Sequence, residues 1–209
     1  MVRIVASAHR RGSASRLLRI IGGTWRGRRL RFPACADIRP TPDRVRETLF
    51  NWLGSRVVGA RGLDLFAGSG ALGLEALSRG AAHVQFVEQQ GEAARSLGRL
   101  LTAWGARNAS VRRGDALRFL AGRSEPFDLV FLDPPFQAGL TAEAARRLEA
   151  GGWLAARAFI YVECAARGGL PEIPGGWTLL KSRHAGEVGY HLFERTSDRS
   201  NGQHVSEAQ

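Results

Sequence analysis

The stretch Asp64-Leu65-Phe66-Ala67-Gly68-Ser69-Gly70-Ala71-Leu72-Gly73 decides the fold, because it joins a short apolar segment to a helical one through a glycine-rich turn. Gly68 and Gly70 permit a tight turn and a close approach of a ligand to the backbone. Gly73 permits a helix to pack closely on the preceding strand. The pattern predicts a strand-to-helix turn of an α/β sheet, although the glycine spacing alone also fits a dinucleotide-binding loop.

Short apolar segments alternate with helical ones on the C-terminal side of this turn. We predict strands at 62–66, 83–88, 109–113, 127–133, 157–163, 177–182 and 188–194, and helices at 70–80, 91–103, 115–121 and 139–149. This alternation predicts a Rossmann-like α/β fold, in which a mostly parallel sheet has helices on both faces. The last two strands, joined around 184–186, are expected to form a hairpin that adds antiparallel pairing.

An acidic residue stands at the end of each of three successive predicted strands. Asp64 can hold the ammonium group of a methionine moiety, Glu88 can accept hydrogen bonds from ribose hydroxyls, and Asp115 can accept one from an adenine amino group. Three acids at strand ends suit a cationic, phosphate-free ligand such as S-adenosylmethionine, whereas a dinucleotide needs a helix N-terminus for its pyrophosphate. Each acid could instead be a loop or N-cap residue, an alternative that weighs most for Asp115.

The segment Asp133-Pro134-Pro135-Phe136 follows the most apolar predicted strand. The nitrogen of an aryl amine is a poor nucleophile, because its lone pair is delocalised into the ring. A carboxylate and a backbone carbonyl can each accept one N–H of such an amine and stabilise the developing positive charge. We assign these two acceptors to Asp133 and the Pro134 carbonyl. The two prolines stiffen the loop, and Phe136 can stack on an extruded base. A simple proline turn is the alternative.

The positive charge of the chain is concentrated near its N-terminus. The net charge is +11, and residues 1–61, with 14 arginines and three acids, carry all of that excess. Such asymmetry is typical of a segment that binds a polyanion, although a solvated arginine face is the alternative. We predict a basic hairpin over 17–32 and a helix that begins with Thr41 as N-cap and ends at Gly54. The candidate phosphate contacts are Arg19, Arg26, Arg28, Arg29, Arg31, Arg39, Arg44 and Arg46.

Several other classes of protein are disfavoured. No apolar run reaches the roughly 18 residues of a membrane span, so we expect no membrane association. The basic N-terminus lacks the apolar core of a secretion signal, and either a presequence or an RNA-binding tail fits its composition. Cys35 and Cys164 are far apart, and the five histidines show no ligand spacing, so neither a disulfide nor a metal site is expected.

The sequence resembles the RsmD-type 16S ribosomal RNA guanine-N2 methyltransferases. The similarity spans roughly residues 17–195. The matching stretches are RIIGGTWRGRRL (19–30), RPTPDRVRETLFNWL (39–53), LDLFAGSGALGLEALSRGA (63–81), FLDPPF (131–136) and HAGEVGYHLFER (184–195). The glycine loop and DPPF are shared with many amino-group methyltransferases, whereas the first two stretches are more particular to this family.

The resemblance implies a class I methyltransferase that uses S-adenosylmethionine and modifies one guanine N2 amine of 16S rRNA in the assembling small ribosomal subunit, in the cytoplasm. It extends the cofactor contacts to Phe66, Ala67, Gly68, Ser69, Gly70 and Ala116, and the RNA contacts to Gly22, Gly23 and Thr41. We expect a monomer with a flexible basic tail (1–16), an RNA-binding module (17–60), a methyltransferase domain (61–195) and a disordered tail (196–209).

Three alternatives stay open on the residues alone. An adenine-N6 methyltransferase of DNA or RNA would use the same DPPF chemistry. An NAD-dependent oxidoreductase would use the glycine loop, but it leaves DPPF and the basic module without a role. A non-catalytic RNA-binding protein would not need the complete set of acids.

Overall fold

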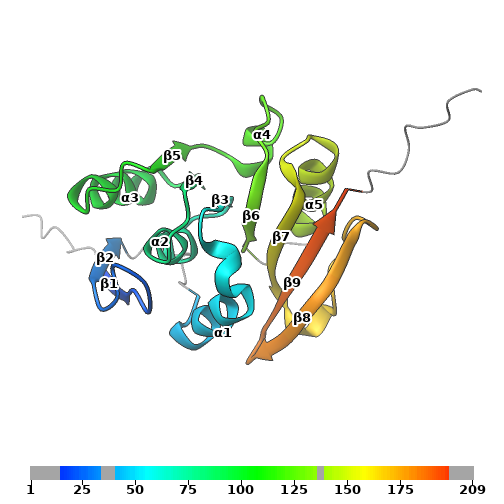
Figure 1. The fold of residues 1–209 in the computed structure, drawn as a ribbon, viewed down its shortest axis with the longest axis horizontal. Helices are drawn as coiled ribbons and strands as arrows, with labels where there is room; N and C mark the ends of the chain where they lie inside the picture. The colour runs from blue at the N-terminus through cyan, green and yellow to red at the C-terminus, as the bar shows by residue number, and fades with distance from the viewer. Residues whose placement is uncertain (1–14, 34–40, 136–138, 198–209) are drawn as a thin grey trace, which may run out of the picture.

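A seven-stranded sheet forms the centre of the molecule in a computed structural model, which describes residues 15–33, 41–135 and 139–197 (Figure 1). The strand order is β5-β4-β3-β6-β7-β9-β8. The strands are β3 (Arg61–Asp64), β4 (His83–Glu88), β5 (Ala109–Arg113), β6 (Phe127–Leu132), β7 (Leu154–Ala165), β8 (Trp177–Ala185) and β9 (Val188–Thr196). The first five in chain order pair in parallel, and β9 runs antiparallel to both β7 and β8. The predicted sheet and its C-terminal hairpin are therefore confirmed.

Helices cover both faces of this sheet. On one face, α1 (Asp43–Leu53), α2 (Ala71–Ser78) and α3 (Gly91–Ala103) share a core with the hairpin residues and the facing strand residues. On the other face, α4 (Ala116–Phe119) and α5 (Leu140–Ala150) pack with a second core. Two short 3-10 turns, Gly54–Val57 and Ala166–Gly168, extend the ends of α1 and β7. Two cores separated by one sheet are the arrangement that alternating strands and helices require.

The order of the strands creates a switch point between β3 and β6. The chain runs outward from β3 to β4 and β5 and then returns to β6 on the other side of β3. Connections therefore leave the carboxyl ends of β3 and β6 in opposite directions, which opens a crevice where ligands bind in such sheets. Asp64 ends β3, and Asp133 directly follows β6. Two of the four acids singled out by the sequence thus lie at the switch point.

The N-terminal hairpin consists of β1 (Ser15–Arg19) and β2 (Arg29–Pro33), with Leu17 opposite Arg31 in antiparallel register. It lies against α2 and α3 (Figure 1). The Thr24 amide donates to the carbonyl of Ser78 at 2.7 Å. Trp25 packs edge-on against Trp104, which follows α3, with ring centroids 5.2 Å apart. The hairpin is therefore packed as part of the domain core.

The start of α1 differs from the prediction. The N-cap position is occupied by Pro42, which makes no side-chain cap, and the helix begins at Asp43. Thr41 is buried, and its hydroxyl donates to the carboxylate of Asp133. A local capping rule assigns this hydroxyl to a backbone amide of the helix, but in the structure it makes a tertiary hydrogen bond instead. The end at Gly54, with φ of 54°, agrees with the prediction.

The described strands also reach into the two predicted tails. Ser15 and Arg16 belong to β1, and Thr196 belongs to β9. Ser197 is also described, and its amide donates to the Ala156 carbonyl at 2.8 Å. Residues 1–14 and 198–209 lie outside the described residues. Within the described ranges, no helix combines the length and apolar character needed to cross a membrane.

Candidate active site

The glycine loop connects β3 to α2 and depends on its glycines for packing. Gly70 has φ of 79°, and a Cβ there would lie 2.7 Å from a methyl group of Leu97. At Gly73, inside α2, a Cβ would lie 2.2 Å from the ring of Phe86 on β4. Real Cβ contacts are never this short, so Gly73 permits the close approach of α2 to the sheet, as the sequence predicts.

Two carboxylates accept the hydrogen bonds of three backbone amides in this region. The Gly73 amide donates to Asp64 Oδ2 at 3.0 Å, and the Gly68 amide donates to Glu88 Oε2 at 2.7 Å. The other oxygen of Glu88 accepts from the Gln90 amide at 2.6 Å. A pyrophosphate bound at this turn would need free amides and would meet two acids instead. The arrangement therefore favours a phosphate-free, cationic ligand over a dinucleotide.

Asp64 is a buried acid that forms no ion pair with any lysine or arginine of the described residues. Asp64 is only 3% exposed. Burial raises its pKa from 3.8 to about 7, the negative charge of Glu88 adds to the rise, and the Gly73 amide opposes it. A cation placed against a buried carboxyl group strongly stabilises its ionised form. This is the position at which the sequence predicts an ammonium group.

Asp115 occupies the N-cap of α4, where its Oδ1 accepts from the Arg118 amide at 2.9 Å. The capping alternative considered for this residue is thus part of its role. The second carboxylate oxygen of Asp115 accepts no hydrogen bond from the described residues, and its predicted contact with an adenine amino group stays a prediction. Ala116, the first residue of α4, is buried directly behind it.

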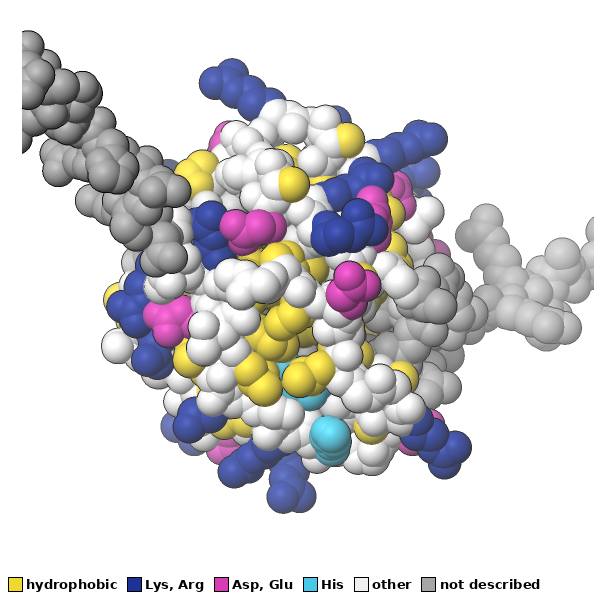
Figure 2. Space-filling view, turned by 90° about the vertical axis from the view of Figure 1, so that its right-hand side faces the viewer, with side chains coloured by type: hydrophobic (Ala, Val, Ile, Leu, Met, Phe, Trp, Pro, Cys, Tyr) yellow, Lys and Arg dark blue, Asp and Glu magenta, His cyan; other side chains and the backbone are white. Residues whose placement is uncertain are grey.

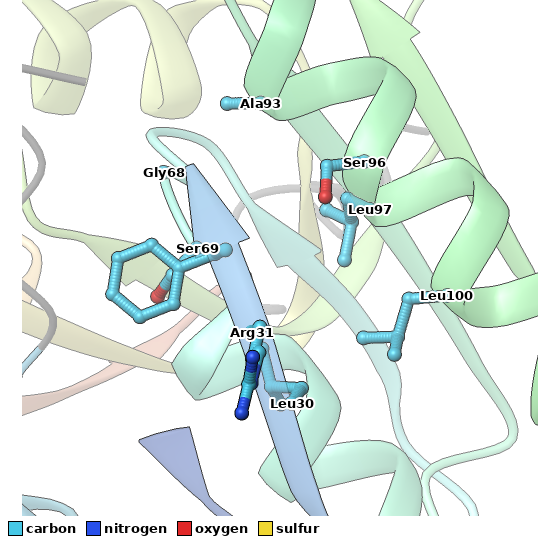
Figure 3. A pocket seen from close by; sticks show the side chains of 9 residues that line it. Leu30, Arg31, Gly68, Ser69, Ala93, Ser96, Leu97 and Leu100 are labelled. Carbon is cyan, nitrogen blue, oxygen red and sulfur yellow. The ribbon is translucent and has the colours of Figure 1, made fainter. Parts of the chain in front are cut away.

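A narrow crevice, partly open to solvent, lies between β2, the glycine loop and α3 (Figure 3). It is lined by Leu30, Arg31, Phe32, Gly68, Ser69, Ala93, Ser96, Leu97 and Leu100. None of the strand-end acids lines it, so we do not assign it to the reacting groups. It shows instead that the hairpin strand β2 forms one wall beside the glycine loop.

Asp133 lies at the carboxyl end of β6, on the same face of the sheet as Asp64. Leu63 and Val130 belong to the α5-side core, so Asp64 and Phe131, which are paired in register, face α1. Asp133, two residues beyond Phe131, shares that face. Burial raises the pKa of Asp133 well above its ordinary value, and the charges of Glu163 and Asp64 raise it further.

The loop that follows Asp133 is partly described. Pro134 is buried and Pro135 is exposed. Phe136 lies outside the described residues, so its proposed stacking on a base stays a prediction. Neither proline has an N–H, so neither can donate a hydrogen bond to the carboxylate before it.

The sequence analysis missed Glu163, a further acid at this edge. Leu132 pairs with Val162 in the parallel register, so Asp133, directly after β6, lies beside Glu163, two residues before the end of β7. The Tyr161 hydroxyl donates to Glu163 Oε1 at 2.8 Å. Burial raises the pKa of Glu163, and hydrogen bonds from Tyr161 and Thr41 oppose that rise. The available signal was a fifth acid at a strand end, since the predicted strand 157–163 ends at Glu163.

Arg46 corrects a prediction. Its side chain is fully buried, so it cannot be the RNA contact proposed from the sequence. Its guanidinium pairs with Glu75 of α2 at 3.3 Å and with Asp43 at 2.5 Å. A buried arginine needs such partners, because an unpaired buried charge is strongly destabilising. Arg46 therefore stabilises the fold.

Gly22 and Gly23 also have structural roles. The Gly22 amide donates to Glu75 Oε1 at 2.7 Å. Gly23 has φ of 77°, and a Cβ there would lie 1.8 Å from the Ser78 carbonyl oxygen. These glycines allow the hairpin to dock on α2. Their contact with RNA stays a prediction.

Thr41, also predicted to contact RNA, is buried, and its hydroxyl donates to Asp133 instead. The remaining predicted arginine contacts are exposed where they are described. These residues are Arg19, Arg26, Arg28, Arg29, Arg31 and Arg44. Arg28 lies over the ring of Trp104, 5.4 Å from its centroid. Arg39 lies outside the described residues. By contrast, the face at the β8 edge mixes arginines and acids around an apolar centre (Figure 2).

The strand order, the glycine loop and the acids at the switch point define the class of the protein: it is a Rossmann-like class I methyltransferase. The family described as "Conserved hypothetical protein 95" matches residues 18–194. The chain belongs to this family, in agreement with the resemblance found in its motifs.

Its relatives carry methyltransferase names. The chain is 50% identical to ribosomal RNA small subunit methyltransferase D of Escherichia coli K12, over 88% of this chain and 92% of that protein. It is 44% identical to the protein of the same name in Haemophilus influenzae, over 85% and 93%. The solved structure "Putative methyltransferase yhhF" from Escherichia coli has a TM-score of 0.82 and 47% identity, over 87% of this chain and 99% of that one.

Proposed function

We propose that this protein transfers a methyl group from S-adenosylmethionine to the N2 amine of a guanine in 16S rRNA of the assembling small subunit. The observation that carries the proposal is the pair Asp64 and Asp133, which end neighbouring strands at the switch point and face the same side of the sheet. One acid suits a cationic cofactor and the other suits an amine. The names of the relatives support ribosomal RNA as the substrate.

The residues at the carboxyl edge fit S-adenosylmethionine. Because the Gly73 amide donates to Oδ2 of Asp64, we assign Oδ1 to the ammonium group of the methionine moiety. Glu88 would accept from the ribose hydroxyls with the lone pairs that the Gly68 and Gln90 amides leave unused. Asp115 would accept from the adenine amino group. The bound cofactor supplies a methyl group made electrophilic by its sulfonium.

Asp133 and the Pro134 carbonyl would accept the two N–H bonds of the guanine amine. These contacts orient the nitrogen lone pair and stabilise the positive charge that develops on the nitrogen. Once methylated, the nitrogen must lose a proton. The raised pKa of Asp133 makes its carboxylate a better proton acceptor than an exposed aspartate. For the same reason, activity should fall as the solution is acidified and Asp133 becomes protonated.

The exposed arginines of the hairpin and of α1 would bind the phosphates around the target. Arginine clamps phosphate through two parallel hydrogen bonds, and these residues carry the excess positive charge of the chain. We propose that residues 17–60 act as the RNA-binding module and 61–195 as the methyltransferase domain. The cytoplasm, where ribosomal subunits assemble, is the expected compartment, and we propose a monomer.

The decisive experiment maps methylated nucleosides by mass spectrometry. Small subunits and deproteinised rRNA from a strain lacking this protein are incubated with the purified chain and labelled S-adenosylmethionine, then digested. We expect N2-methylguanine at a single site, and its absence from an Asp133→Ala reaction in which the protein still binds S-adenosylhomocysteine. Detection of N6-methyladenine alone would show that the target base is adenine and not guanine. Binding of NAD but not S-adenosylhomocysteine would overturn the methyltransferase proposal.

A matched pair of variants tests the RNA surface. Arg44→Ala should reduce the slope of log affinity for rRNA against log salt by about 0.9 for each lost phosphate contact. Arg123→Ala removes an exposed arginine before the amino end of β6, far from the carboxyl edge, and should leave the slope unchanged. Equal slopes in both variants and the wild type would exclude Arg44 from the interface.

A further inference from the structure

A buried network connects the N-terminal segment to the centre of the fold. Arg46 Nη1 donates to Glu75 at 3.3 Å, its Nη2 donates to the Arg19 carbonyl at 2.9 Å, and its Nε donates to the Thr41 carbonyl at 3.2 Å. One guanidinium therefore holds the hairpin, α2 and the segment before α1 together. Because Arg46 is fully buried, its hydrogen bonds are protected from exchange with water. The backbone of Thr41 is fixed as a result.

The side chain of Thr41 extends from this fixed backbone to the amine site. Thr41 is 5% exposed, and its hydroxyl donates to Asp133 Oδ2 at 3.4 Å. A donor from elsewhere in the chain is needed here, because the prolines that follow Asp133 have no N–H to offer its carboxylate. A carboxylate held by one oxygen keeps its other oxygen, Oδ1, in a defined direction.

We propose that Thr41 is a positioning residue of the amine site: its hydroxyl holds Oδ2 of Asp133 so that Oδ1 faces the substrate nitrogen, and Arg46 holds Thr41. This inference deepens the proposed function and rests on it. It means that the segment preceding α1, which the motif assigns to RNA contact, contributes a side chain to the reacting end of the enzyme. Thr41 acts through Asp133 and does not itself touch the amine.

The charges around Asp133 make the role of the hydroxyl measurable. Glu163 on β7 and Asp64 on β3 both raise the pKa of Asp133, and the Thr41 hydrogen bond opposes them. Tyr161 faces the same cluster and donates its hydroxyl to Glu163. The Thr41 hydroxyl also lowers the pKa of Glu163, so the two carboxylates share this donor. Loss of the Thr41 donor must therefore raise the pKa of Asp133 further. The carboxylate form then appears only at higher pH, so the acidic limb of the activity profile moves upward.

The test compares two substitutions of Thr41 in the full chain. Thr41→Val keeps the volume and removes the donor, whereas Thr41→Ser keeps the donor. For Thr41→Val we expect kcat to fall about tenfold, the effect of losing one hydrogen bond to a charged group. The KM for S-adenosylmethionine should stay unchanged, and the acidic limb should move to higher pH. Thr41→Ser should recover most of kcat and the wild-type profile.

A control variant and the wild type separate the possible failures. Thr102→Val changes an exposed threonine whose hydroxyl donates to its own helix, and it should leave kcat and the pH profile unchanged. If Thr41→Val matches the wild type, or if Thr41→Ser loses as much activity as Thr41→Val with no shift of the limb, the positioning role is wrong. If the wild type itself forms no N2-methylguanine, the proposed function fails instead.

Discussion

The pKa of Asp64 predicts how tightly the cofactor binds at different pH values. In the free protein this pKa is about 7, mainly because the group is buried. A cation against the carboxylate requires its ionised form, so binding below pH 7 must expel a proton. The apparent Kd is the intrinsic Kd multiplied by one plus the ratio of protonated to ionised enzyme. This factor is about 11 at pH 6 and about 1.1 at pH 8, so affinity should rise about tenfold, or about 1.4 kcal/mol.

Isothermal titration with S-adenosylhomocysteine measures this effect, since that product keeps the ammonium group and undergoes no reaction. Titrations at pH 6 in buffers of different ionisation enthalpy should show release of nearly one proton. Asp64→Asn should bind more weakly at pH 8 and lose the pH dependence. The control Asp128→Asn should keep the pH dependence of binding, because Asp128 lies at the opposite end of the sheet, where its carboxylate accepts from the Arg61 amide. A wild-type Kd that differs less than twofold between pH 6 and pH 8 would refute the assignment of Asp64.

Three further predictions concern stability and the amine site. Gly73→Ala should lower the free energy of unfolding, measured by urea denaturation, by about 1–3 kcal/mol, because the new Cβ would clash with the ring of Phe86. Gly98→Ala on α3 places its Cβ in open space and should raise the free energy of unfolding by about 0.5–1 kcal/mol. Arg46→Ala should cost about 3–5 kcal/mol in the same assay by leaving a buried carboxylate unpaired, and a loss below 1 kcal/mol would contradict that view. Glu163→Gln removes a negative charge that raises the pKa of Asp133, so the acidic limb of the kcat–pH profile should move to lower pH. An unchanged limb, or one that moves to higher pH, would contradict this effect of Glu163 on Asp133.

The sheet could be predicted from the sequence because its signals are local. Apolar runs such as Phe127–Leu132 end at acids or glycines, and strand ends in a parallel sheet meet at one edge whatever the details of packing. The positions of Asp64 and Asp133 therefore followed from the order of elements alone. Their environments did not, since burial and the charge of Glu163 depend on how β7 and α1 close over them.

The role of Arg46 could not be read from composition, because a charge count does not distinguish a surface arginine from a buried one. Two signals were present. Arg46 lies between Val45 and Leu49 on the buried stripe of its helix, and Glu75 is the single acid of the otherwise apolar α2. An arginine and a glutamate on two apolar stripes suggest a buried pair. Thr41 was misassigned because a capping rule considers only neighbours in sequence, whereas its partner lies 92 residues away.

Glu75 also bears on how the chain can be divided. Besides Arg46, it accepts from the amides of Ile21 and Gly22 and from Arg79. Three of these four donors come from the first 60 residues, so a fragment starting at residue 61 would keep a carboxylate in its core with most of its hydrogen bonds missing. The basic segment and the rest of the chain therefore do not form separate folding units. We expect both parts to unfold in one cooperative transition.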